Sequence, residues 1–360
     1  DVARQRLFNQ RIEGERFGKP EEVVCWLGAV QAQDYAQALW AIGSRLRSAT
    51  IADVERSIAD GKIVRTWPMR GTIHFVPPEN ARWMLELCAS RMLARDDRRL
   101  EQLDLDRKIL ERCKDLFYDA LNGGERLSRP DVMRLLEDSG ISTEKQRGYH
   151  ILWYLAQSGL ICMGPMRDKQ QTFGLLDDWV PDSRELSREE SLAELTRRYF
   201  AGHGPATVHD FARWAGLTIA ETRSGIEAAT PELVSEKIDG KEYWTANVAP
   251  GRTEPESIGV HLLPGFDEYV IGYKDRSAVL AGEHASRIVP GKNGVFMPVI
   301  VVDGRVVGTW KRKLKKNSID VTLAPFAQLG ESEERAVELA ESYGAFIGLP
   351  VSSVEIASGY

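Results

Sequence analysis

Cysteines are few and widely separated in this sequence. The four, Cys25, Cys88, Cys113 and Cys162, form no C-x-x-C pair, which is the spacing that holds structural zinc or carries thiol redox chemistry. This absence excludes the common zinc-ribbon and thioredoxin-like designs. We interpret the four side chains as reduced thiols, most of them buried.

Long apolar runs are also missing. The longest candidate, around Val299 to Val302, is followed closely by Asp303 and Arg305, and it is far shorter than the ~18 residues that suggest a membrane helix. Residues 1–11 are mixed in charge and lack the apolar core of a secretory signal. We therefore expect a cytoplasmic protein without a membrane partner.

Histidines and the usual catalytic motifs are sparse. The six histidines lie at positions 74, 150, 203, 209, 261 and 284, without the H-E-x-x-H spacing of a zinc enzyme. His203 and His209 are separated by Gly204 and Pro205, so one helix face cannot present both, and we expect surface or capping roles for them. The motifs G-x-S-x-G, G-x-x-x-x-G-K-[ST] and G-x-G-x-x-G do not occur, so the sequence predicts neither a metal nor a cofactor.

The composition is that of a folded protein with segregated charge. With 360 residues, 43% hydrophobic and 28% charged, the chain should form two or three structural units. The net charge of −6 argues against a protein that coats nucleic acid by bulk positive charge. Residues 305–316 nevertheless hold six cationic side chains and no acid. They could bind phosphates or could protect an exposed strand edge from aggregation.

Helices followed by a two-stranded hairpin are predicted three times. The first set has helices over 20–30, 36–46 and 51–58, then strands over 62–67 and 72–76. The second has helices over 128–137 and 143–157, then strands over 160–163 and 171–175. The third has helices over 192–200, 205–215 and 219–228, then strands over 233–238 and 242–245. These patterns come from apolar periodicity and from turn residues.

This repeated pattern is typical of winged-helix units, in which a helix can enter the major groove of DNA. Winged helices also serve as protein-interaction spacers, and that alternative stays open here. We predict an α+β fold with winged-helix units at 1–125, 126–185 and 186–250, and a β-rich module at 251–360. The acidic, proline-containing stretch 177–190 is predicted as the main linker, and a weaker linker is predicted at 250–256.

The C-terminal module is expected to form a small barrel or a curled sheet. Strands are predicted at 261–263, 269–271, 296–302 and 305–310, and Asp303-Gly304 is a strong two-residue hairpin signal. A closing helix is predicted over 333–346.

Gln31 and Gln33 are an unusual pair, because they follow a predicted helix directly. On a continued helix they would point about 200° apart, so a shared task requires the helix to end before them. Each amide carries a donor and an acceptor and could position a water molecule. A neutral amide is no useful general base, so such a site suits a leaving group that is already activated. From composition alone, the two would be ordinary surface amides.

Four stretches of the chain carry a family resemblance. They are Leu27 to Asp34, Arg65 to His74, Gly204 to Thr207 with Asp210 to Trp214, and Leu262 to Tyr269 with Gly272 to Arg276. As a set, and in this order, they resemble the bacterial winged-helix DNA glycosylases of the AlkZ-like family. The resemblance extends over about residues 5–315.

The resemblance implies a C-shaped protein with three winged helices around a basic concave surface, acting as a monomer on alkylated double-stranded DNA. Members excise N-alkylated bases, and some unhook interstrand crosslinks. The family's Gln-x-Gln signature matches Gln31 and Gln33, whereas another branch has Asp in the second place. A monofunctional glycosylase acting on N7-alkylated purines is therefore expected. The alternative is a non-catalytic DNA-binding protein, either a regulator or a lesion-sequestering resistance protein.

The expected DNA contacts are cationic or polar and come from three places in the sequence. The hairpin tip between Gly164 and Gln171 resembles the family's DNA-probing hairpin in position and polarity. The predicted contacts are Arg65, Arg70, Arg167, Lys169, Gln170, Lys311, Arg312 and Lys313.

Overall fold

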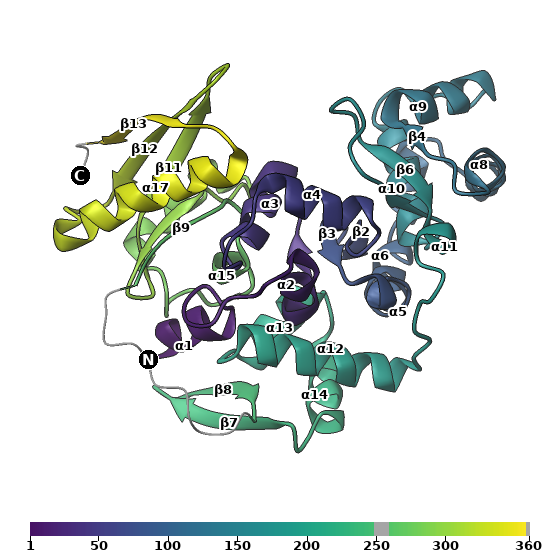
Figure 1. The fold of residues 1–360 in the computed structure, drawn as a ribbon. Coiled ribbons are helices and arrows are strands. Elements are labelled where there is room, and N and C mark those ends of the chain that lie inside the picture. Colours follow the sequence, from purple (N-terminus) through teal and green to yellow (C-terminus); the bar gives the residue numbers. More distant parts are fainter. Residues whose placement is uncertain (248–258, 358–360) are drawn as a thin grey trace. The chain divides into compact units, whose positions relative to one another are not determined.

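The computed structural model describes residues 1–247 and 259–357, in two compact units of a mixed α+β fold. Residues 1–54 and 193–360 form one unit, and residues 55–192 form the other. Figure 1 shows the helices and strands of both. The prediction of four domains stays a prediction, and its last boundary, with the linker at 250–256, falls mainly outside the described residues. No described helix combines the length and apolar character needed to cross a bilayer.

The unit of residues 55–192 contains a small antiparallel sheet with helices around it. Its strands are β2 (Val64–Met69), β3 (Thr72–Val76), β4 (Leu127–Ser128), β5 (Ile161–Met163) and β6 (Thr172–Leu175). They are arranged in the order β3-β2-β5-β6-β4. The longer helices are α8 (Arg107–Leu121), α9 (Arg129–Asp138) and α10 (Arg147–Gln157). The two predicted hairpins, β2–β3 and β5–β6, are confirmed.

The start of α9 follows from local chemistry, whereas α10 begins later than predicted. Ser128 caps α9 by accepting from the Asp131 N–H, and the Asp131 side chain accepts from Ser128 in return, which is a capping box. The helix predicted from residue 143 begins at Arg147, because Lys145 and Gln146 have φ values of 51° and 76°. A left-handed residue cannot continue a right-handed helix.

The other unit begins with four short elements that carry the Gln31 segment. They are α1 (Val2–Asn9), α2 (Pro20–Leu27), β1 (Val30–Gln31) and α3 (Tyr35–Gly43). The helix predicted over 20–30 therefore ends earlier, at Leu27. Gly28 ends it with a φ of 77°, a conformation that glycine adopts without steric cost. Helix α4 (Ile51–Ala59) then crosses into the second unit.

The third predicted set of helices and strands is confirmed. It comprises α12 (Arg188–His203), α13 (Val208–Ala215), α14 (Ile219–Ala228), β7 (Leu233–Ile238) and β8 (Lys241–Ala246). Thr207 and Asp210 form a capping box at the start of α13, and Gly216 ends that helix with a φ of 74°. The count of three winged-helix units remains an interpretation of this pattern.

The C-terminal region forms an open five-stranded sheet, not a barrel. Its strands are β9 (Val260–Leu263), β10 (Val299–Val302), β11 (Arg305–Leu314), β12 (Ile319–Pro325) and β13 (Val351–Ile356). They follow the order β13-β12-β11-β10-β9, so β13 and β9 are its edges and the sheet does not close. The Asp303-Gly304 turn is confirmed, with φ values of 48° and 78°, the positive pair that a type I′ hairpin needs.

One further prediction for this region was wrong, and another was right but incomplete. Residues 269–271 were expected to form a strand, but Glu268–Ile271 is a one-turn helix, α15, because the Asp267 carboxylate caps it by accepting from the Tyr269 N–H. The predicted closing helix is confirmed as α17 (Glu333–Ile347), yet the described chain continues into β13, which pairs in parallel with β12.

Helix α17 and helix α3 share an aromatic core with the sheet. Figure 1 shows α17 lying along the strands. Tyr343 of α17 packs edge-on against Trp40 of α3 at 5.2 Å and against Trp310 of β11 at 5.1 Å. The Trp40 indole N–H donates to the Leu262 carbonyl at 2.8 Å. Helix α3, which directly follows the Gln31–Gln33 segment, is thereby fixed to the sheet.

Candidate active site

The Gln31 segment is not helical, as a shared task of the two amides requires. Gln31 ends β1, no regular structure is assigned to Ala32, and the chain bends at Gln33. Gln31 is half-buried, Ala32 is fully buried and Gln33 is exposed. Ala32 is thus part of the core, and the glutamine on either side of it is more accessible.

The residues after Gln33 begin helix α3. Asp34 caps this helix, and its carboxylate accepts from the Gln37 N–H at 3.2 Å. The Gln37 carbonyl oxygen in turn accepts from the Gly265 N–H at 3.0 Å. The chain that follows Gln33 is thus held in place by Asp34 and Gln37.

The turn before Gln31 is held by helix α12. Arg198 donates to the Cys25 carbonyl at 2.7 Å, which satisfies one of the carbonyls at the end of α2. A Cβ atom at Gly28 would lie 3.4 Å from Arg198 and 3.8 Å from Trp214. Both distances are ordinary van der Waals contacts, so Gly28 is required here by its positive φ and not by lack of space.

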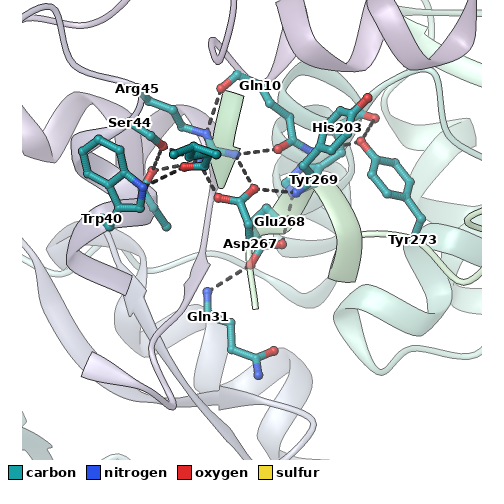
Figure 2. Close-up of polar contacts among 12 residues, drawn as sticks. Gln10, Gln31, Trp40, Ser44, Arg45, His203, Asp267, Glu268, Tyr269 and Tyr273 are labelled. Carbon is teal, nitrogen blue, oxygen red and sulfur yellow. Dashed lines mark hydrogen bonds and ion pairs between the residues drawn. The ribbon is translucent and has the colours of Figure 1, made fainter. Parts of the chain in front are cut away.

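Glu268 is a residue of this region that no sequence pattern singled out. One of its oxygens, Oε1, accepts from the Gln31 backbone N–H at 2.9 Å, and Oε2 accepts from the Trp214 indole N–H at 2.9 Å. His203 Nε2 lies 3.3 Å from Oε2. Glu268 and His203 are both fully buried. Figure 2 shows the Gln31 backbone N–H directed at Glu268 while the Gln31 side chain points away from it.

The burial of His203 corrects a prediction. A surface or capping role was expected, but the ring lies at the end of α12 stacked on Tyr199 at 4.8 Å, with Trp214 at 5.2 Å. Apolar packing of its faces keeps water away from the imidazole. His209, the second histidine of that pair, is exposed as expected.

A second buried acid lies beside Glu268 and has its own cation. Arg45 donates to both oxygens of Asp267, at 2.8 and 2.9 Å, and also to the Gln10 side chain at 2.7 Å. Gln10 donates to the Tyr273 hydroxyl at 3.0 Å, which donates to the His203 carbonyl at 2.8 Å. Figure 2 shows this network on one side of Gln31. It ties α1, α3, α12 and the residues around α15 together.

No cluster of three or more metal-ligating side chains occurs among residues 1–247 and 259–357. Three of the cysteines, Cys88, Cys113 and Cys162, are buried and unbridged, while Cys25 is half-buried. Burial raises the pKa of the Cys113 thiol to about 11 and that of Cys162 to about 12, so both stay protonated at neutral pH. The prediction of free, mostly buried thiols is confirmed.

Two of the predicted DNA contacts on β11 lie next to helix α3. Lys311 and Arg312, with Leu314, line a recess of about 370 Å³ that also includes Gln37 and Pro298. Gln37 is four residues from Gln33. Lys311 and Lys313 are exposed, and Arg312 is half-buried with its guanidinium over the Tyr343 ring. Leu314 is 60% exposed at the end of this strand.

The remaining predicted contacts lie in the unit of residues 55–192. Arg167, Lys169 and Gln170 are exposed at the β5–β6 hairpin tip. Arg70 is half-buried and lies 3.2 Å from His74 Nε2. Arg65 is buried at 6% exposure and donates to the Gln171 side chain at 2.5 Å. So little of Arg65 is accessible that we leave it out of the DNA contacts proposed below.

Comparisons with known proteins show which family the chain belongs to. A curated interstrand DNA cross-link repair glycosylase from Streptomyces sahachiroi is 28% identical over 322 residues, which is 85% of each chain. The solved structure of Streptomyces sahachiroi DNA glycosylase AlkZ matches with a TM-score of 0.82 and 25% identity, over 99% of this chain and 98% of that one. The family model described as DNA glycosylase AlkZ-like matches residues 24–346. The chain therefore belongs to the AlkZ-like DNA glycosylase family.

Proposed function

We propose that this protein is a DNA glycosylase that hydrolyses the N-glycosidic bond of N7-alkylated purines in double-stranded DNA. The observation that carries the proposal is the non-helical Gln31–Gln33 segment, in which two neutral amides, one half-buried and one exposed, flank the buried Ala32. Gln31 and Gln33 would hold the attacking water by hydrogen bonds to its oxygen and hydrogens.

Such a site fits a cationic leaving group. Alkylation at N7 leaves the purine positively charged, so the electron pair of the C1′–N9 bond neutralises the base as it departs and no general acid is needed. The water oxygen then bonds to C1′ and its proton passes to solvent. Two amides contribute by positioning, which can lower a barrier by several kcal/mol, without accepting that proton themselves.

The cationic residues supply the proposed contacts with DNA. Lys311, Arg312 and Lys313 would neutralise phosphates near α3, and the Arg167–Gln170 hairpin tip would contact the duplex elsewhere. Arg70 is retained as a further contact. A curated relative is named as an interstrand cross-link repair glycosylase, so we include bulky adducts and crosslinks among the proposed substrates.

Base release tests this proposal directly. Duplex DNA with N7-methylguanine is incubated with wild type, Gln31→Ala, Gln33→Ala and the double variant, and free base is measured with spontaneous loss subtracted. Wild type should release base and leave abasic sites without strand cleavage, while the double variant should be at least a hundredfold slower. Equal rates for all four proteins, with DNA still bound, would favour the non-catalytic binding protein instead. A crosslinked duplex in the same assay tests the wider substrate range.

A further inference from the structure

The carboxylate of Glu268 must be ionised to satisfy its neighbours. The Gln31 N–H and the Trp214 indole N–H are donors only, and each points to a different oxygen of Glu268. A protonated carboxyl would have to turn its own hydrogen toward a donor. Only the ionised form accepts at both oxygens, and its hydrogen bonds to these N–H groups are of the strong, charge-assisted kind.

His203 also faces this carboxylate. Its Nε2 lies 3.3 Å from Glu268 Oε2, the oxygen that also accepts from Trp214, and so carries a hydrogen directed at that oxygen.

The other charges around Glu268 have cations of their own. Asp267 is neutralised by Arg45, and Asp210 on α13 faces Arg6 on α1 at 3.9 Å. Two tyrosines lie close to this group. Burial raises the pKa of the Tyr199 hydroxyl well above its ordinary value, and burial also raises the pKa of Tyr273. Glu268 thus places a buried negative charge directly behind the Gln31 peptide.

We propose that Glu268 is a positioning residue for base release: it holds the Gln31 peptide by its N–H and places a fixed negative charge behind the two amides. The inference rests on the proposed glycosylase function. Positive charge grows on the deoxyribose as the glycosidic bond breaks, and a preorganised charge of opposite sign in a buried setting lowers the energy of that state. The amides position the water, and Glu268 supplies the charge that they lack.

Variants separate the charge from the fold. Glu268→Gln keeps the size and an oxygen for the Gln31 N–H but removes the charge. Trp214→Phe removes one hydrogen bond to Glu268 and keeps the carboxyl group and the Gln31 contact, so it tests that hydrogen bond alone. Glu338→Gln, which breaks only an exposed ion pair on α17, is the matched control for loss of a charge. Single-turnover base release, DNA affinity and thermal midpoint are measured for all three. Glu268→Gln should release base at least tenfold more slowly, with affinity within twofold of wild type, while Glu338→Gln should match wild type.

The pH profile supplies a measurement that a purely structural role would not affect. After subtraction of spontaneous depurination, the wild-type rate should fall on the acid side as Glu268 is protonated. Loss of a hydrogen bond raises a carboxyl pKa, so the acid limb of Trp214→Phe should move to higher pH. This comparison does not depend on the folding of Glu268→Gln.

Failure of the inference can be told from failure of the proposed function. A wild type that releases no base overturns both. A wild type that is faster than Gln31→Ala but no faster than Glu268→Gln keeps the glycosylase and overturns the role of Glu268. Two other results also overturn the role of Glu268. In the first, Glu268→Gln and Trp214→Phe lose equal amounts of rate, in proportion to their losses of stability. In the second, the rates of wild type and Trp214→Phe fall at the same acidic pH.

Discussion

Arg45 and Asp267 form a two-pronged ion pair in which neither side chain is accessible to solvent. The pair joins the end of α3 to the cap of α15, and so connects the helix that follows Gln33 to the one that begins with Glu268. Removal of one charge leaves the other buried and unpaired, which typically costs about 3–5 kcal/mol.

Asp267→Asn should accordingly lower the free energy of unfolding by about 3–5 kcal/mol, as measured by urea denaturation. Glu338→Gln is the control, because it breaks an exposed ion pair with Arg335 on α17 and should cost well under about 1 kcal/mol. If Asp267→Asn lowered the free energy of unfolding as little as Glu338→Gln does, the Arg45–Asp267 pair would not be important for stability.

His261 predicts a dependence of stability on pH. It lies on β9, and burial lowers the pKa of its imidazole, an effect that Glu13 at 3.9 Å partly offsets. The unfolded chain binds this proton near the ordinary value of about 6.5, whereas the folded chain binds it only at lower pH. As far as His261 determines it, the free energy of unfolding should therefore be highest above about pH 6.5 and should decrease as the pH falls below that value.

Urea midpoints at pH 7.5 and pH 5.5 check this effect. The difference between the two midpoints should be smaller for His261→Gln than for wild type, because glutamine does not titrate. An equal difference in the two proteins would show that His261 takes no part.

Lys311 and Lys313 predict the salt dependence of DNA binding. If each contacts one phosphate, then Lys311→Ala/Lys313→Ala should lower the slope of log affinity against log salt by about 0.9 for each phosphate that is no longer neutralised. Fluorescence anisotropy between 50 and 200 mM salt gives the slope.

The control for this pair is Lys108→Ala/Lys114→Ala on α8, where Lys114 pairs with Glu111. It removes the same number of charges from a helix that also carries acids, and its slope should match wild type. Equal slopes for all three proteins would assign Lys311 and Lys313 to protection of the strand edge.

Gly272 predicts a steric limit next to the buried histidine. A Cβ atom at this position would lie 2.8 Å from His203 Cδ2 and 2.5 Å from the Glu268 carbonyl oxygen. Gly272→Ala should lower the free energy of unfolding by about 1–3 kcal/mol through overpacking. Gly282→Ala, where nothing lies within 4 Å of the added atom, should leave the thermal midpoint within a degree or two. Similar midpoints for both variants would show that the His203 contact adapts.

Local signals predicted the hairpins well. The Asp303-Gly304 turn occurs as expected, and Asp239-Gly240 makes the same kind of connection between the predicted strands β7 and β8, because two residues with positive φ determine the connection. The prediction of a barrel was wrong, because a sheet closes only if strands that are far apart in the sequence pair with each other. The strand β13 was missed for the same reason, since its partner β12 is about thirty residues earlier.

The site was predicted only in part. Gln31 and Gln33 were selected by a motif. The end of the helix before them was inferred because, on a continued helix, the two side chains would point in different directions. Glu268 was missed, although Asp267-Glu268-Tyr269 lay inside a stretch that carried the family resemblance. No local pattern distinguishes a surface glutamate from one that accepts a backbone N–H 237 residues away. Tyr269 to Ile271 looked like a strand because aromatic and β-branched residues favour strands, while the cap at Asp267 sets a helical turn.

The large separation of Gln31 and Glu268 along the chain has a consequence during protein synthesis. Ribosomes add roughly 5–20 residues per second, so the 237 residues between Gln31 and Glu268 take on the order of ten to fifty seconds. Throughout that interval a nascent chain already displays its glutamines but lacks the anchor behind them. The contact that holds the Gln31 peptide therefore forms only after most of the polypeptide has left the ribosome.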